Sequence, residues 1–211
     1  MLRLPSLQQI AIMLPALIFA FTIHEISHGL MAYLLGDATA KRDGRLSLNP
    51  IRHIDPLGLI FILFAGFGWA KPVMVNPNNL KNPKVDMALI SIAGPISNFI
   101  MAFLAVMLMY PFLVLNLPMY VIQVLSAFIT LNIVLGVFNL LPVPPLDGSK
   151  VVAGLLPDAL YERLPQFSRY GMVILLLLMV TGVLADVIGP ITGAIRDMLF
   201  DVTQFIYGFI L

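Results

Sequence analysis

The chain has 211 residues, of which 60% are hydrophobic and 11% are charged, and its formal net charge is +1. Soluble domains carry about 25% charged residues, so this composition, with a mean hydropathy of +0.97, excludes an ordinary soluble domain and predicts a polytopic membrane protein. The small net charge provides no basic stripe to neutralise phosphates, which argues against a nucleic-acid partner. The absence of cysteine excludes disulfides and thiolate metal sites.

The first apolar run, residues 7–35, is long enough for a transmembrane helix, which needs about 20 residues. It contains His24, Glu25 and His28 in the pattern HExxH. Positions i and i+4 share one helix face, so both imidazoles can approach one metal ion while Glu25 projects beside them. Ionisable side chains are costly in hydrocarbon, and we therefore interpret this group as functional rather than as two hydrogen-bonded core histidines.

The segment that follows the first run is harder to interpret. Within residues 36–56, Asp43 and Gly44 separate two short stretches and predict a small β-hairpin near the membrane interface. Residues 57–69 are apolar but short, which suits a half-helix, a re-entrant segment or a span that begins near residue 54. Residues 71–77 favour a short extended piece. Lysine and arginine occur both after the first run and after this short one, so the positive-inside rule gives no orientation.

Residues 85–113 and 117–141 predict two further spans. The stretch 142–145, Pro-Val-Pro-Pro, then ends the helix, because proline lacks the amide donor and clashes with the preceding turn. Non-helical backbone at membrane depth is tolerated where protein or water covers it, so this break predicts an internal cavity. A short helix over 151–156, a span over 170–188 and a tail helix with one apolar face, either interfacial or packed on the bundle, complete the chain.

These elements predict an all-α polytopic membrane protein that forms one domain over residues 1–211. We expect a bundle of about five to six helices, with the hairpin or extended membrane-associated segments after the first helix.

A catalytic zinc site generally has three protein ligands and leaves its fourth position to water, so a third ligand is needed. Cysteine is absent and Glu162 lies in a polar loop, which leaves aspartate. Asp147 follows the proline break, where irregular backbone can aim its carboxylate at the first helix, although it can equally cap the helix that follows. Asp186 in another apolar run and His53 in a polar segment are the rivals. The residues alone leave this choice open.

Three separated motifs then resemble one family. They are His24-Glu25-xx-His28-Gly29, Gly94-Pro95-xx-Asn98 and Asn139-xx-Pro142-x-Pro144-x-Leu146-Asp147-Gly148. Together they resemble the site-2 protease family of intramembrane zinc metalloproteases, and the resemblance extends from residue 7 to the helix after the third motif. Residues 68–77 resemble compact members of that family, which lack PDZ-like and CBS-like domains. Met74 departs from the pattern, because a proline is expected there.

The resemblance implies a set of ligands for one zinc ion per chain: His24, His28 and Asp147. It implies Glu25 as the catalytic acid and base, and supporting roles for Asn98 and Asn139. Either asparagine can hydrogen-bond the oxyanion or the substrate backbone. The alternative for both is hydrogen bonding between helices.

The predicted function is that of an intramembrane zinc endopeptidase that cleaves within or near transmembrane segments of membrane proteins, in the cell membrane of a prokaryote. Its partners are then a transmembrane substrate and the lipid bilayer. The alternative is a metal ion transporter or channel, because buried histidine and aspartate also mark ion pathways. A substrate helix must unwind before cleavage, and an extended edge around Val73 and Val75 can pair with the unwound chain.

Overall fold

The computed structural model describes residues 6–65, 68–161 and 164–210, and within these ranges the chain forms nine α-helices and no β-strand. The five long helices are α1 (Leu7–Leu34), α4 (Pro83–Val114), α5 (Met119–Asn139), α8 (Leu164–Val180) and α9 (Val183–Ile210). The short ones are α2 (Thr39–Arg42), α3 (Pro56–Ala65), α6 (Asp147–Leu155) and α7 (Asp158–Tyr161), with 3-10 turns η1 (Pro50–Arg52) and η2 (Pro77–Asn79). The all-α prediction is confirmed. The predicted helix count was too low, because four helices have only 4 to 10 residues.

Three helices, α1, α4 and α5, are each long and apolar enough to cross a membrane. Helices α8 and α9 meet the same test only as a pair, bent by 78° at a short break, and count together as a fourth candidate span. The predicted continuous span over 170–188 is therefore wrong. Gly182 adopts φ +80°, a left-handed conformation that ends α8, and α9 leaves in a new direction.

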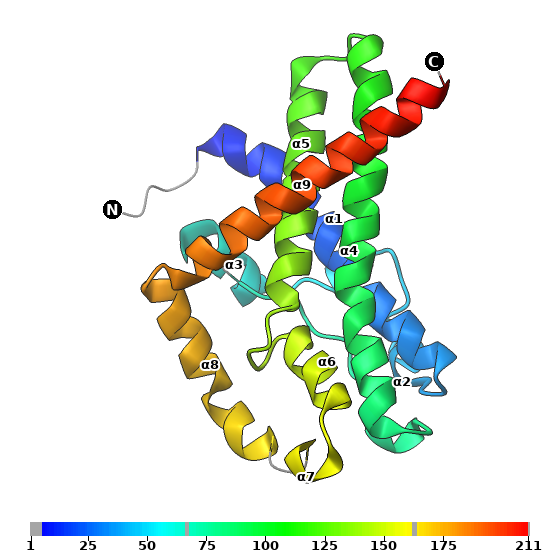
Figure 1. Cartoon of the computed structure of the whole chain (residues 1–211), viewed down its shortest axis with the longest axis vertical. Helices are drawn as coiled ribbons and strands as arrows, with labels where there is room; N and C mark the ends of the chain where they lie inside the picture. Colours follow the sequence, from blue (N-terminus) through cyan, green and yellow to red (C-terminus); the bar gives the residue numbers. More distant parts are fainter. Residues whose placement is uncertain (1–5, 66–67, 162–163, 211) are drawn as a thin grey trace.

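The apolar core lies where α4, α5 and α9 meet. Figure 1 shows α9 crossing α5 and α4 obliquely on the near side of the bundle. Small residues of α4, Ala102 and Ala105, allow this close approach, and Ile133 of α5 and Leu199 of α9 are buried with them. The tail helix is thus packed on the bundle, the second of its two predicted placements.

The predicted β-hairpin after the first helix is wrong. Residues 39–42 form α2, whose first turn is held by Asp37, since Asp37 Oδ1 accepts the Thr39 amide at 3.1 Å. Gly44, with φ +66°, ends this helical turn, and the Arg45 amide donates to Ala40 O at 2.9 Å. A glycine with positive φ serves a helix C-terminus as well as a hairpin turn, so the Asp-Gly pair was ambiguous.

Helix α3, as described, is too short to cross a membrane by itself. Its ten residues span about 15 Å, half of a hydrocarbon core about 30 Å thick. Ile54 pairs with Ala70 in an isolated antiparallel bridge, and the Lys71 amide donates to His53 O at 2.8 Å. The chain therefore returns to the point where it left, as a half-helix does. Residues 71–76, which follow, are non-helical, in agreement with the predicted extended piece.

Because Ile54 pairs with Ala70, the two polar segments that flank α3, residues 35–55 and 70–82, lie together between α1 and α4 at one end of the bundle. They and the first turn of α4 carry seven of the twelve basic residues: Lys41, Arg42, Arg45, Arg52, Lys71, Lys81 and Lys84. The α4–α5 connection at the opposite end, residues 115–118, carries no charged residue. By the positive-inside rule, we expect the end with the basic segments to face the cytoplasm.

The orientation can be tested directly because the chain has no cysteine. Lys81 and Leu115 are both exposed, at opposite ends of α4. In intact bacterial spheroplasts we expect a membrane-impermeant maleimide to label Leu115→Cys, and to label Lys81→Cys only after permeabilisation. The reverse pattern would contradict this orientation.

Candidate metal centre

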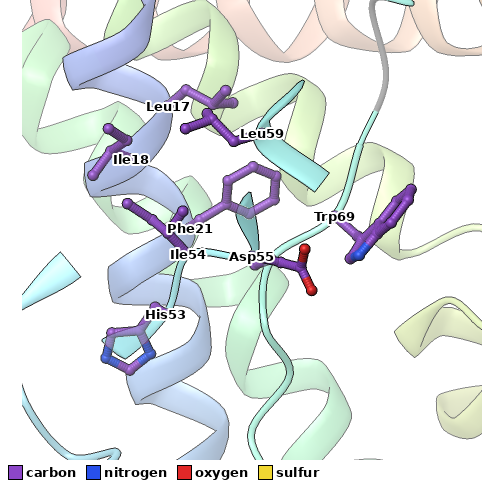
Figure 2. A pocket seen from close by; sticks show the side chains of 9 residues that line it. Leu17, Ile18, Phe21, His53, Ile54, Asp55, Leu59 and Trp69 are labelled. Carbon is purple, nitrogen blue, oxygen red and sulfur yellow. The ribbon is translucent and has the colours of Figure 1, made fainter. Parts of the chain in front are cut away.

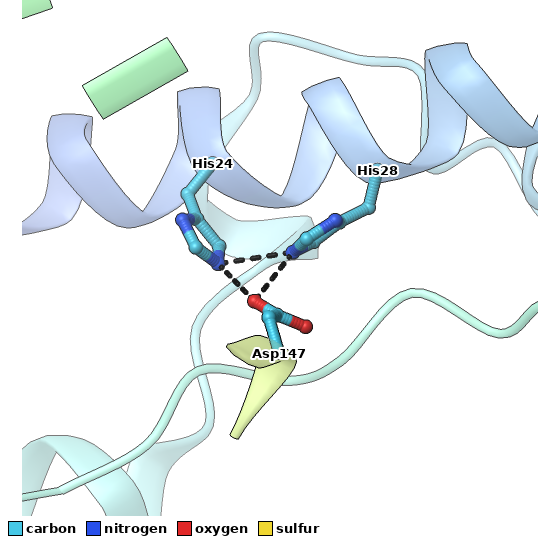
Figure 3. A group of neighbouring side chains, drawn as sticks. All are labelled: His24, His28 and Asp147. Atoms are coloured by element: carbon cyan, nitrogen blue, oxygen red, sulfur yellow. Dashed lines mark hydrogen bonds and ion pairs between the residues drawn. The ribbon is translucent and has the colours of Figure 1, made fainter. Parts of the chain in front are cut away.

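Three donor atoms converge between α1 and the start of α6: His24 Nε2, His28 Nε2 and Asp147 Oδ2 (Figure 3). The two Nε2 atoms lie 3.0 Å apart, and Asp147 Oδ2 lies 3.2 Å from that of His24 and 3.1 Å from that of His28. Ligands on a tetrahedral zinc with bonds of about 2.0–2.1 Å are separated by about 3.3 Å. The three separations and the two-imidazole, one-carboxylate donor set therefore fit zinc. Within the described residues this is the one such group of histidine and acidic side chains.

Each ligand position follows from its local structure. His24 and His28 are one turn apart on α1 and share a face, with 4% and 8% of their surfaces exposed. Asp147 is the first residue of α6, which begins where the proline-rich break after α5 ends. Leu146, and not Asp147, occupies the N-cap position, and no side chain caps this helix. The carboxylate of Asp147 faces α1 instead.

The two rivals for the third ligand lie elsewhere. Asp186 is an exposed residue in the first turn of α9. His53 is fully buried, but it lines a separate cavity of about 20 Å³ beside α1 (Figure 2). Its Nε2 hydrogen-bonds to Ser47 O at 2.8 Å. The structure therefore brings only Asp147 to the two histidines of the HExxH pattern.

Both imidazoles are oriented by acceptors on α4. His28 Nδ1 donates to Ile90 O at 2.7 Å, and His24 Nδ1 lies 2.7 Å from Asn98 Oδ1. A carbonyl oxygen can only accept, so each Nδ1 carries a ring proton and each Nε2 is the nitrogen left to bind a metal ion at the centre. Such second partners also keep a ligating ring in place.

Glu25 lies beside the three donor atoms without joining them. It is 8% exposed, lines the same cavity as the ligands, and its Oε2 accepts the Val73 amide at 2.9 Å. The buried guanidinium of Arg45 donates to Pro72 O at 2.9 Å. The non-helical segment 71–76 is thus fixed against the carboxylate that the sequence predicts to be the acid and base.

Asp37 holds the far end of the same segment. Its Oδ2 accepts the Asn76 amide and its Oδ1 accepts Asn79 Nδ2, both at 2.7 Å. Burial alone would raise the pKa of Asp37, but hydrogen bonds from Thr39, Asn79 and backbone amides outweigh it and lower the pKa to about 2. The carboxylate therefore stays charged at every pH near neutrality, and the segment stays anchored.

Comparison with known proteins identifies the family. The model of peptidase family M50 matches residues 116–181. "Putative zinc metalloprotease YwhC" of Bacillus subtilis is 43% identical over 202 residues, which cover 90% of each chain. The chain belongs to the site-2 protease family, peptidase family M50. Two proteins named "Putative zinc metalloprotease Rip2" also match it. The protein of Mycolicibacterium smegmatis is 27% identical, and the match covers 78% of this chain and 64% of the relative. The protein of Mycobacterium tuberculosis is 29% identical, and the match covers 74% of this chain and 61% of the relative. No solved structure matches.

The candidate centre of this M50 protein opens into a cavity of about 1360 Å³. Apolar side chains of α1, α5 and α8 form most of its wall, and residues 68–70 and 72–75 close one side. Asn139 lines this cavity, and its Nδ2 donates to Leu135 O at 3.0 Å. Asn98 does not line it: the side chain is fully buried behind His24. The two asparagines predicted to share a role therefore occupy different positions.

The structure adds two residues that the sequence analysis did not single out. Asn132 of α5 accepts a hydrogen bond from Asn98 Nδ2 at 2.9 Å. Lys150 is the one lysine or arginine among the described residues that line the cavity, with its Nζ 3.9 Å from Asp147 Oδ1. Asn132 had a readable signal, since it is a polar residue in an apolar span and lies two turns before Asn139 on α5.

Two motif glycines allow the helices to meet at the centre. A Cβ placed on Gly94 would lie 2.5 Å from His28 Nε2 and 2.7 Å from His24 Cε1, closer than real Cβ contacts. A Cβ on Gly148 would collide with Leu140 O at the end of α5. The first glycine gives space to both rings, and the second lets α6 begin against α5.

We expect Gly94→Ala to lose most of its bound zinc, because the added methyl group would displace both imidazoles. The measurement is the zinc content of the purified protein relative to wild type. Gly193→Ala in α9 is the matched control: no atom lies within 4 Å of its Cβ position, and alanine favours a helix. A full equivalent of zinc in Gly94→Ala would contradict the crowding argument.

Proposed function

We propose that this M50 protein is an intramembrane zinc endopeptidase in which His24, His28 and Asp147 hold one zinc ion and Glu25 is the acid and base. The observation that carries the proposal is the convergence of the three donor atoms within 3.2 Å of one another, beside a buried carboxylate, in an apolar cavity. The 43% identity to a protein named as a zinc metalloprotease supports it.

When bound, zinc supplies a Lewis acid that polarises the scissile carbonyl and lowers the pKa of the attacking water. Glu25 accepts a proton from that water as general base and returns it to the departing amine as general acid. The peptide C–N bond breaks, one water is consumed, and a carboxylate and an amine leave. Ile90 O and Asn98 keep both imidazoles in the tautomer that this chemistry needs.

The two asparagines then have separate roles. Asn139 uses one N–H on Leu135 O, and its second N–H can donate to the substrate carbonyl from the cavity wall. Donors of this kind contribute about 3–4 kcal/mol to transition-state stabilisation in other hydrolases. Asn98 has no access to the cavity and acts through His24, as a positioning residue.

The substrate class follows from the cavity wall. Its apolar side chains suit an apolar transmembrane segment, and the unwound backbone of that segment needs hydrogen-bond partners. The described residues give no hydrogen bond to the amides of Met74 and Val75, and Met74 is 62% exposed. Methionine at position 74 keeps an amide donor that a proline would lack. These groups can pair with an extended substrate, the strand-addition mode of recognition.

The deciding experiment compares Glu25→Gln and Asp147→Asn with wild type. Glu25→Gln is expected to keep its zinc and to cleave a transmembrane model substrate at least ~100-fold more slowly, the usual size of a general acid-base contribution. Asp147→Asn should lose both zinc and cleavage. If Glu25→Gln cleaves at the wild-type rate, Glu25 is not the acid and base. If wild type carries zinc into liposomes without cleaving any membrane peptide, the protease proposal fails in favour of transport.

Segment 71–76 is tested with proline, which removes one amide donor. Val73→Pro removes the donor to Glu25, and Val75→Pro removes a donor offered to substrate; each should slow cleavage roughly tenfold, the value of one hydrogen bond of about 1.4 kcal/mol. Zinc content should not change. Val73→Ala and Val75→Ala keep the amides and serve as controls. Wild-type turnover in Val75→Pro would contradict strand pairing.

A further inference from the structure

A chain of buried amides lies behind His24 and links three helices. His24 Nδ1 on α1 bonds Asn98 Oδ1 on α4 at 2.7 Å, and Asn98 Nδ2 bonds Asn132 Oδ1 on α5 at 2.9 Å. Asn132 Nδ2 in turn donates to Phe128 O, one turn earlier on α5, at 2.9 Å. Both asparagines have no exposed surface. No substrate can reach them, so any contribution that they make to the chemistry must pass through His24.

The chain has a single direction, which its far end determines. Phe128 O is a backbone carbonyl that can only accept, so Asn132 must present its NH2 group there and its Oδ1 to Asn98. Asn98 must then present its NH2 group to Asn132 and its Oδ1 to His24. A second carbonyl, Ala20 O, lies 3.4 Å from Asn98 Nδ2 and favours the same orientation. With Oδ1 facing it, His24 Nδ1 must carry the ring proton.

We propose that Asn132 is a positioning residue: through Asn98 it fixes the His24 tautomer whose Nε2 lone pair faces the metal centre. The inference rests on the proposed function, because the tautomer matters only if His24 is a ligand. His28 needs no such chain, since its Nδ1 donates directly to the backbone oxygen of Ile90. The backbone carbonyl of Ile90 thus orients the His28 ring directly. The backbone carbonyl of Phe128 orients the His24 ring indirectly, through the side-chain amides of Asn132 and Asn98.

The test uses two substitutions of Asn132: one removes the oxygen that accepts a hydrogen bond from Asn98, and the other keeps it. Asn132→Leu removes the oxygen that accepts from Asn98 Nδ2 at 2.9 Å and leaves only the longer contact to Ala20 O at 3.4 Å, so the Asn98 amide can turn more readily and the ring proton of His24 can move to Nε2. Asn132→Asp keeps an oxygen that accepts from Asn98 Nδ2. Its second oxygen faces Phe128 O, so we expect this fully buried carboxyl to be protonated and to donate there, which preserves the direction of the hydrogen bonds. The matched control is Ile133→Ala, a fully buried neighbour in the apolar core that takes no part in the chain.

Two measurements apply, zinc affinity by chelator competition and 15N NMR of the ring nitrogens in zinc-free protein. The protein has only three histidines, so the ring signals can be assigned by substitution. Asn132→Leu should bind zinc at least ~10-fold more weakly, the lower end for partners of metal ligands, and shift the His24 proton toward Nε2 while His28 is unchanged. The zinc affinity of Asn132→Asp should stay within about threefold of the wild-type affinity. Ile133→Ala should melt at a lower temperature with the wild-type tautomer and affinity.

Wild-type zinc affinity together with a His24 Nδ1 proton in Asn132→Leu would overturn the inference. Equal weakening in Asn132→Leu and Asn132→Asp would overturn it too, because the direction of the chain would then not matter. If Asn132→Leu does not fold, a redistributed His24 proton in Asn132→Asp would overturn it on its own. Failure of the proposed function has a different signature: a wild-type protein that holds zinc and the His24 Nδ1 proton but cleaves no membrane peptide.

Discussion

The contact of α4 with α1 at Gly94 is the constraint on which the centre depends. The absent side chain leaves space for both imidazoles, and a Cβ there would meet atoms of His24 and His28. The acceptors for the two rings lie one turn to either side, at Ile90 and Asn98. One stretch of α4 therefore sets the separation, the tilt and the Nδ1 hydrogen bonds of two imidazoles that α1 alone could place only roughly.

The proposed third ligand and the proposed acid-base carboxylate depend on a different device, irregular backbone packed against the helices. The break after α5 is satisfied internally, as the Val143 amide bonds Leu141 O and the Leu146 amide bonds Val143 O. Segment 71–76 is held by side chains instead, since Arg45, Asp37 and Glu25 each hydrogen-bond its backbone. In hydrocarbon an open backbone group costs several kcal/mol, so irregular segments persist only with such partners or beside a polar cavity.

These two devices explain what the sequence could and could not predict. The i, i+4 histidines and the proline break are local patterns, and the structure places both histidines on one face of α1 and ends α5 before the prolines, as these patterns predicted. The choice among Asp147, Asp186 and His53 depended on convergence of α1 with α6, which no periodicity encodes. The role of Gly44 was misread because positive φ suits two local structures, and the bend at Gly182 because one glycine hardly interrupts an apolar run.

The sequence alone could not predict the membrane orientation or distinguish the two asparagines, because both depend on contacts between distant parts of the chain. Whether residues 57–69 cross the membrane depends on the bridge between Ile54 and Ala70, a non-local contact that brings the basic segments to one end. Asn98 and Asn139 look alike in sequence, as polar residues in apolar spans, and only their burial separates a residue behind a ligand from one that faces the cavity.

Helix α4 also divides the molecule between stability and chemistry. Its second half contributes Ala102, Ala105 and Val106 to the dry core shared with α5 and α9, where close packing rather than a hydrophobic driving force holds helices together in lipid. Its first half contributes Gly94 and Asn98 to the polar centre. Buried polar networks in which every member is satisfied make a core rigid and specify one arrangement among similar ones. The apolar half therefore holds the bundle together, and the polar half fixes the register in which α1, α4 and α5 meet, so that a small displacement between these helices would open the metal centre before it loosened the core.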